Sequence, residues 1–355
     1  MIGRGIDQVL RHPVDPVLYE EYMRSAQGYV ELAEQAHGPI PRSVAPDYVW
    51  GEALEVLDSV VPDCRIVNLE TTLTTSPAAW PAKEVHYRAH PANVDVLLAA
   101  RLDCCTLANN HALDWGTDGL LQTLDTLGSA GIAVAGAGRS LAEVEAPAVI
   151  GAPSGRVIVV ALGSTTSGTF REWSAGPAKP GLAVVDGWST DVCPRIADRL
   201  SRVRHAGDVV VASVHWGSNW GYAVPGGQRR LAHALVDVAG VDVVFGHSSH
   251  HPRPVEIYRE RPILYGCGDF ITDYEGIGGH EEYRNDLVLG WFLSMETATG
   301  RVVSLDMAPF QARRFRLERP SESDVVWLAD VLDRHSRPFG IHVRVVDDGF
   351  LAAEW

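Results

Sequence analysis

Apolar residues occur in short, nearly continuous runs along much of this chain. The runs 156–162, 209–214 and 241–245 are rich in valine and contain few polar positions. Runs of this length and composition predict strands that are buried on both faces of a sheet. Between them lie segments whose apolar residues recur every three or four positions, which is the pattern of an amphipathic helix. Because strands and helices alternate, the sequence predicts a layered α/β core.

The pattern also sets the expected order of elements. The expected helices cover 16–35, 51–60, 91–100, 117–127, 192–204, 228–238 and 323–334, and the expected strands cover 64–70, 102–107, 132–137, 156–162, 209–214, 241–245, 255–258, 263–265, 287–295, 301–307 and 341–346. Gly3–Asp7 has the pattern of a turn, and 71–81 and 163–180 that of loops. We expect one domain over 1–310 and a helix–strand extension over 311–355 that packs on it.

Polar side chains lie at the far ends of four of the expected strands or just after them. They are Asn68 and Glu70, then Asn110, His111 and Asp114, then His215, and finally His247 and His250. In open α/β sheets, ligands bind outside the carboxyl ends of the strands. Imidazole nitrogens with carboxylate and carboxamide oxygens suit a divalent ion such as Mn, Fe, Zn, Mg or Ca. Four such strand ends together favour a functional site.

Each cluster also has a structural interpretation. Asn and Asp are common in turns and at helix N-termini, so 107–114 would serve as an Asn-rich turn with a capping Asp. A single His at a strand end, such as His215, is more often structural than functional. The glycines 131, 136 and 138 lack the strand–GxGxxG–helix context of a nucleotide-binding fold.

Composition narrows the classes of partner. The chain has 355 residues, 46% of them hydrophobic, and a formal charge of −15. An acidic surface argues against nucleic acid or an anionic membrane as the main partner. The cysteines are odd in number and form no CxxC motif, which predicts buried free thiols in a reducing compartment. No apolar run reaches the length of a membrane helix, and the first residues do not resemble a signal peptide, so we expect a cytoplasmic protein.

The order of these motifs resembles the CapA-type family, named for capsule and poly-γ-glutamate synthesis. The resemblance rests on Asn-Leu-Glu at 68–70, Asn-Asn-His-x-x-Asp at 109–114, His-Trp-Gly at 215–217, Gly-His-x-x-His at 246–250 and Tyr-Gly-Cys-Gly-Asp-Phe at 265–270. It extends from Met1 to about Pro309. That family is similar to the calcineurin-like metallophosphoesterases, which implies a four-layer α/β sandwich with two central mixed sheets and a metal site at the strand ends.

The resemblance implies roles for individual residues. Glu70, Asn110, His215 and His247 are the expected metal ligands, His250 is a further candidate ligand, and His111 resembles the proton donor of the phosphoesterase motif. Chains of this family usually open with a strand that ends in Gly-Asp-Val-Met, whose Asp bridges two metals, and this sequence begins at the Met. A single divalent ion (Ca, Mn, Mg or Zn) is therefore expected, and one ion with imidazoles around it suits proton transfer better than a two-metal phosphoryl clamp.

One CapA-like branch acts in lasso-peptide biosynthesis as an epimerase of the precursor's C-terminal residue, and this chain resembles that branch. Inversion at a Cα needs a base on one face and an acid on the other, which two His residues oriented by Asp residues would supply. The candidate pairs are His111 with Asp114, and His86 or His250 with Asp7 or Asp269; the sequence leaves these pairings open.

Substrate-binding residues are less clearly indicated. Arg88 would hold a peptide carboxylate, or would form an ordinary surface ion pair. Trp216, Trp220 and Tyr222 would line an aromatic pocket, or would pack in the core or in loops.

Three functions therefore remain open. The first is a metal-dependent epimerase with a peptide substrate. The second is a metallo-hydrolase of phosphoester, γ-glutamyl or other amide bonds. The third is a non-catalytic subunit of polymer synthesis. The sequence does not identify the oligomeric state.

Overall fold

The computed structural model describes residues 1–81 and 83–355. Its helices are α1 Gly5–Val9, α2 Gln27–His37, α3 Ala53–Val60, α4 Asp95–Ala99, α5 Gly116–Ser129, α6 Leu141–Glu145, α7 Cys193–Ser201, α8 Gly226–Asp237 and α9 Glu322–Ser336. Its strands are β1 Ile66–Asn68, β2 Thr72–Leu73, β3 Arg88–Ala89, β4 Cys104–Thr106, β5 Ala133–Ala135, β6 Ala137–Gly138, β7 Ala148–Ala152, β8 Gly155–Ser164, β9 Gly181–Leu182, β10 Val184–Val185, β11 Val209–His215, β12 Val243–His247, β13 Val255–Tyr258, β14 Arg261–Leu264, β15 Leu287–Glu296, β16 Arg301–Arg313, β17 Arg316–Glu318, β18 His342–Val345 and β19 Leu351–Glu354.

Three larger sheets form the centre of the molecule. A seven-stranded sheet follows the order β10-β8-β11-β12-β14-β13, with β7 paired to β8. A three-stranded parallel sheet follows β1-β4-β5, and a five-stranded antiparallel sheet follows β15-β16-β19-β18, with β17 paired to β16. The architecture is therefore mixed α/β, as the apolar pattern predicted. The expected sandwich had two central sheets, whereas the described strands form three larger sheets and two two-stranded ones, so the calcineurin-like arrangement stays a prediction.

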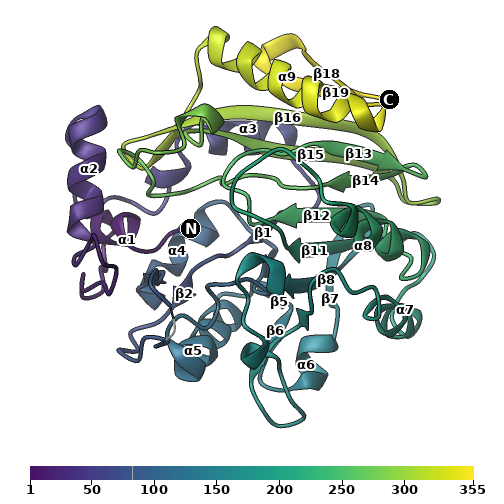
Figure 1. Ribbon diagram of the computed structural model, residues 1–355, viewed down its shortest axis with the longest axis horizontal. Coiled ribbons are helices and arrows are strands. Elements are labelled where there is room, and N and C mark those ends of the chain that lie inside the picture. The colour runs from purple at the N-terminus through teal and green to yellow at the C-terminus, as the bar shows by residue number, and fades with distance from the viewer. Residues whose placement is uncertain (82) are drawn as a thin grey trace.

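The helices cover the outer faces of these sheets. In Figure 1, α7 and α8 lie beside the seven-stranded sheet, α5 and α6 lie below, and α9 covers the top together with β18 and β19. β11 is buried along its whole length, which explains its nearly continuous apolar sequence. The segment 311–355 contributes β19, which pairs with β16, so it extends an existing sheet.

Most long elements lie where the pattern placed them, and the hairpin of β15 and β16 turns through Thr299 and Gly300 as expected. The predicted helix over 16–35 is wrong in its first part. Only 27–37 is helical, and 16–26 forms an irregular connection. Gly3–Asp7 also differs, because residues from Gly5 onward begin α1. The loop 71–81 contains β2, which pairs with β3, and α6, β7 and β19 were not predicted. Two-residue strands give too few positions for a period to be recognised.

The cysteines form no disulfide among the described residues, and four of the five are buried. Within the same residues, no helix combines the length and the apolar character that a bilayer span requires.

Candidate functional site

The polar strand ends gather at one edge of the sheets. In the parallel pair β11 and β12, His215 lies directly opposite His247. In the parallel pair β1 and β4, Asn68 lies opposite Thr106. Because parallel strands end at the same sheet edge, each register brings polar side chains together.

A chain of hydrogen bonds joins the two sheets below this edge. Thr106 Oγ1 on β4 lies 2.9 Å from Ser213 Oγ on β11, and Ser213 Oγ lies 2.7 Å from His247 Nε2. The Nδ1 atoms of His247 and His215 are 2.8 Å apart, so one ring donates to the other. His215 Nε2 is buried and has no partner among the described atoms. The chain of bonds thus orients His215 with a free nitrogen toward the site.

Burial keeps these two imidazoles neutral. It lowers the pKa of His247 to about 3. Burial also lowers the pKa of His215 well below its usual value, and the neighbouring His247 lowers that pKa further. Neutral imidazole is the form that binds a metal ion or accepts a proton.

Glu70 is the carboxylate nearest to the histidines. Its Oε1 lies 3.9 Å from Nε2 of His111 and 3.9 Å from Nε2 of His215, while its Oε2 accepts a hydrogen bond of 3.0 Å from Asn68 Nδ2. Burial raises the pKa of Glu70 to about 7, although the nearby His250 acts in the opposite direction. A buried carboxylate with so few donors is suited to a bound cation.

The first proton-transfer candidate is the pair of His111 and Asp114. Nδ1 of His111 lies 2.7 Å from Asp114 Oδ2, and the Tyr87 backbone N–H donates to that oxygen at 2.7 Å. Lys83 Nζ bonds to Asp114 Oδ1 and to the backbone carbonyl of Asn110, and it lies 2.9 Å from His111 Nδ1. Burial and the neighbouring Lys83 ammonium group together lower the pKa of His111 to about 4, although Asp114 acts in the opposite direction. Burial would raise the pKa of Asp114, but His111 and Lys83 outweigh it and hold that pKa below its usual value.

The second candidate is the pair of His250 and Asp269. His250 Nδ1 lies 3.1 Å from both carboxylate oxygens of Asp269. Burial would lower the pKa of His250, but Asp269 outweighs it and raises the pKa above its usual value. The two pairs are connected: the Tyr274 hydroxyl lies 3.4 Å from His250 Nε2 and accepts from Tyr87, whose ring packs edge-on against His111 with centroids 4.5 Å apart. His111 and His250 therefore belong to one site and carry opposite pKa shifts.

The predicted metal ligands fit a metal ion only in part. His215 Nε2 and Asn110 Oδ1 are buried and have no hydrogen-bond partner among the described residues. Buried polar atoms normally have a partner, so these two atoms fit the role of metal ligands. Glu70 supplies a carboxylate near both histidines. His247 differs, because both of its ring nitrogens already have partners, so as arranged it orients His215. Among the described residues no three His, Cys, Asp or Glu side chains converge closely enough to form a complete metal site by themselves. A metal ion would take Glu70, Asn110 and His215 as its protein ligands.

A family model described as the bacterial capsule synthesis protein PGA_cap matches residues 1–274, which contain every group named above. This chain belongs to the PGA_cap family. It is 46% identical, over 99% of its length and 93% of the relative, to a Mycobacterium tuberculosis protein described as a probable polyglutamine synthesis accessory protein. It is 32% identical to the PGA biosynthesis protein CapA of Bacillus subtilis, over 62% of this chain and 54% of that protein. The CapA-type resemblance is thereby confirmed; the lasso-peptide branch is not shown.

The structure places two of the proposed acid–base residues of this PGA_cap protein outside the site. Asp7 accepts hydrogen bonds from the backbone N–H groups of Val14 and His90 and from Asn93 Nδ2. Its carboxylate thus links α1 to the segments around residues 14 and 90–93. His86 Nε2 donates to the carbonyl of Trp80. Among the described residues no hydrogen bond or ion pair joins Asp7 and His86 to each other, or either of them to His250 or Asp269. The pairing is therefore His250 with Asp269, and proposed pairs that use Asp7 or His86 are wrong.

Arg88 and Trp216 have structural roles. The guanidinium of Arg88 donates to the carbonyls of Ser76 and Asp15 and lies 3.8 Å from the ring centre of Trp115. It is buried, so it neither presents a free fork to a carboxylate nor forms a surface ion pair. Trp216 is fully buried and donates from Nε1 to the Tyr265 carbonyl, as the core-packing alternative expected.

Trp220 and Tyr222 lie next to the site in an aromatic cluster. The ring of Trp220 is 5.5 Å from His250 and stacks on His280 at 4.0 Å. Tyr222 stacks on His335 at 4.2 Å. Both side chains are partly exposed, and of the two only Trp220 contacts His250 among the described residues. Their role in substrate binding stays a prediction.

Sequence reasoning missed Lys83, Ser213 and Tyr274. Lys83 lies in an irregular segment where neither period nor motif marks it. Ser213 was visible as the one polar residue in an apolar strand, which is a usable signal that its hydroxyl has a buried partner. Tyr274 reaches His250 only through the path of 271–286, which no local pattern predicts.

Proposed function

We propose that this protein is an accessory enzyme in the synthesis of a polyglutamate-type polymer and that the site around Glu70 acts on the polymer or its precursor. The observation that carries the proposal is the pair of His–Asp dyads, His111–Asp114 and His250–Asp269, connected through two tyrosines beside a buried carboxylate. The names of the relatives from Mycobacterium and Bacillus support the polymer context.

The chemistry follows from the charges. A divalent ion held by Glu70, Asn110 and His215 would polarise an amide or carboxylate oxygen of the substrate. His111, neutral because of its burial, would accept a proton, and His250, whose cation Asp269 stabilises, would donate one. Such a pair suits cleavage or transfer at an amide carbonyl.

The gene's deletion in its own host, with complementation, tests the proposal. Wild-type protein should restore glutamate in the cell-associated polymer, measured by amino-acid analysis after acid hydrolysis. His111→Ala and His250→Ala should fail to restore it while being expressed at wild-type level. Trp355→Ala, at the exposed C-terminus, is the matched control and should restore it. If deletion leaves the polymer unchanged, the proposed context is wrong. If His111→Ala restores it fully, the role is non-catalytic.

A second candidate is a peptide epimerase, which the same two dyads favour because inversion requires an acid and a base together. Incubation of a peptide substrate with protein and Mn²⁺ in deuterium oxide should introduce deuterium at the inverted Cα. Cleavage without deuterium at any Cα would favour the amide chemistry instead.

A further inference from the structure

Tyr274 places its hydroxyl group against His250. Its Oη lies 3.4 Å from His250 Nε2, and its ring packs edge-on against the imidazole with centroids 5.0 Å apart. Tyr87 donates a hydrogen bond of 2.9 Å from its own hydroxyl to Tyr274 Oη. Tyr87 is buried, whereas Tyr274 is half-buried. Tyr274 is therefore the member of this pair that has surface left for a further contact.

The hydrogen atom of the Tyr274 hydroxyl is not used in the bond with Tyr87. A phenolic hydroxyl has one hydrogen to donate and accepts through its oxygen. Because Tyr87 donates, the oxygen of Tyr274 accepts and its hydrogen remains for another partner. Asp269 accepts at His250 Nδ1, so that nitrogen carries a hydrogen, and Nε2 is the atom that gains or loses the second proton.

The role of Tyr274 therefore changes with the state of His250. When Nε2 has no proton, the Tyr274 hydroxyl donates its hydrogen to this nitrogen. When Nε2 carries a proton, the Tyr274 oxygen accepts from it, and the Tyr274 hydrogen is directed to a third group. Such a hydroxyl passes a proton on without being ionised, which suits tyrosine because its ordinary pKa is about 10.

The surroundings of Tyr274 place its hydroxyl inside the candidate site. Burial raises the pKa of Tyr274 well above its usual value, and the carboxylates of Asp269 and Glu70 raise it further because both lie nearby. Glu70 is also the carboxylate nearest to His111 and His215. A substrate held at Glu70 would therefore lie beside the Tyr274 hydroxyl.

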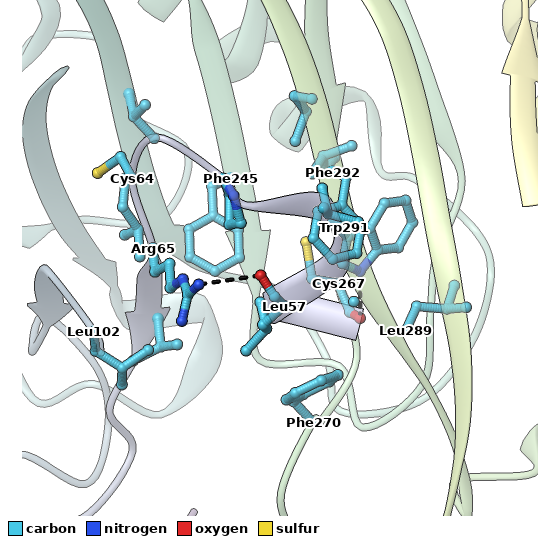
Figure 2. Close-up of a pocket in the computed structure, with 18 of the residues that line it drawn as sticks. Leu57, Cys64, Arg65, Leu102, Phe245, Cys267, Phe270, Leu289, Trp291 and Phe292 are labelled. Atoms are coloured by element: carbon cyan, nitrogen blue, oxygen red, sulfur yellow. Dashed lines mark hydrogen bonds between the residues drawn. The ribbon is translucent and has the colours of Figure 1, made fainter. Parts of the chain in front are cut away.

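The neighbouring cavity does not offer His250 a second route for its proton. Of the residues described, Asp269 lines this cavity of about 1200 Å³, but His250 and Tyr274 do not. Figure 2 shows that its wall is mainly apolar, with Cys267 and Phe270 among the side chains. His250 faces Asp269 with Nδ1 and Tyr274 with Nε2. The path from Nε2 thus runs through Tyr274.

Arg4 fixes the position of Tyr274. Its guanidinium bonds to both carboxylate oxygens of Asp273, the residue before Tyr274, at 3.1 and 2.7 Å. The guanidinium carbon lies 4.5 Å from the ring centre of Tyr87 and 5.8 Å from that of Tyr274. Arg4 is buried, and a bidentate pair of this kind holds its partners in a defined geometry. Arg4 acts through the two tyrosines and is a positioning residue.

We propose that Tyr274 is a further catalytic residue of this site, whose hydroxyl passes a proton from His250 to the leaving nitrogen of a substrate amide. The Nε2–H bond of His250 breaks as a bond forms to Tyr274 Oη. The original Oη–H bond breaks as the lone pair of the leaving nitrogen takes that proton. Tyr274 ends unchanged, and His250 ends as a neutral imidazole whose Nδ1–H stays on Asp269. The assignment rests on the proposed function, because it needs a reaction at an amide.

Complementation of the gene deletion described above tests the catalytic role. Tyr274→Phe keeps the ring against His250 and removes only the hydroxyl. It should lower the restored polymer glutamate at least about tenfold, in line with the contribution of a positioned acid. Its expression and thermal midpoint should match those of the wild type. Tyr265→Phe is the matched control, because it removes a buried hydroxyl that bonds to Glu256, and it should restore the polymer.

Tyr87→Phe separates catalysis from support of the fold. It removes the donor to Tyr274 but leaves the Tyr274 hydroxyl, so it should restore most of the polymer. Equal loss of polymer in Tyr87→Phe and Tyr274→Phe, with a lower thermal midpoint in both, would mean that the two hydroxyls only hold the fold. That result would overturn the proposal.

NMR of metal-free protein labelled at its histidine nitrogens tests the contact without any reaction. Tyr274→Phe should shift the Nε2 signal of His250 and leave its Nδ1 signal, on the side of Asp269, nearly unchanged. Tyr265→Phe should shift neither signal. An unmoved Nε2 signal in Tyr274→Phe would overturn the proposal.

The outcomes distinguish this assignment from the proposed function. If His250→Ala fails to restore the polymer while Tyr274→Phe restores it fully, the proposed function stands and the catalytic role of Tyr274 is wrong. If deletion of the gene leaves the polymer unchanged, the proposed function is wrong, and the catalytic role of Tyr274 is wrong with it.

Discussion

His111 Nδ1 lies 2.7 Å from Asp114 Oδ2, and the Lys83 ammonium nitrogen lies 2.9 Å from the same ring nitrogen. Both His111 and Asp114 are buried, so the carboxylate orients the ring and leaves Nε2 directed toward Glu70. His111→Ala should lower the rate of the proposed reaction by about 10² to 10⁴, because a positioned acid–base group contributes that much. The far-ultraviolet circular dichroism spectrum and the thermal midpoint should change little.

Asp114 differs from His111 because it also holds the backbone. Asp114→Asn should lower the free energy of unfolding by about 3 kcal/mol, since it removes the negative partner of a buried ion pair and replaces one accepting oxygen by an NH2 group. Urea unfolding measures this. Asp118→Asn, in the first turn of α5, is the control and should cost far less. Equal stability of the two variants would contradict a structural role for Asp114.

Lys83 controls the charge of His111. Burial is the larger cause that lowers the pKa of His111 to about 4, and the ammonium group of Lys83 contributes to that shift. Lys83→Met removes the positive charge but keeps much of the side-chain volume, so the pKa of His111 should rise toward its usual value. Titration of the His111 ring by NMR in metal-free protein measures this shift. An unchanged or lower pKa would show that Lys83 does not act on His111 through its charge.

Metal binding should depend on Glu70 and His215. Glu70→Gln and His215→Ala should each weaken Mn²⁺ binding at least tenfold in calorimetric titration, because they remove a carboxylate and a free buried nitrogen. His111→Ala should retain binding. His247→Ala should weaken binding less than His215→Ala, because His247 orients the ligand. Equal Mn²⁺ binding in wild type and Glu70→Gln would remove Glu70 from the metal site.

Asp7 should make stability depend on pH. Burial raises its pKa from 3.8 to about 6, against the hydrogen bonds from His90, Val14 and Asn93. A carboxyl group whose pKa is higher in the folded state contributes its stability below the unfolded pKa of 3.8 and loses it as the pH rises to about 6. That loss is about 3 kcal/mol at 1.36 kcal/mol per unit. Asp7→Asn should remove this part of the slope in urea unfolding between pH 4 and 6; an unchanged slope would contradict it.

The local sequence determined much of the fold and the outline of the site. Continuous apolar runs specify buried strands such as β11 because both faces of such a strand must be covered, whatever the neighbours are. The polar residues that end these runs were expected to meet at one sheet edge, and Glu70, His111 with Asp114, His215 and His250 do lie near one another there.

Only the tertiary structure decided which of these groups meet. Asp269 pairs with His250, whereas Asp7 accepts hydrogen bonds from the backbone N–H groups of His90 and Val14. Such partners are far apart in the sequence, so their pairing depends on how the loops cross the sheet edge. Lys83 enters the site from an irregular segment that carries no periodic signal. The cavity of about 1200 Å³ that β1 and β15 both line likewise depends on sheet edges that come together only when distant strands pack, and no local pattern of residues specifies it.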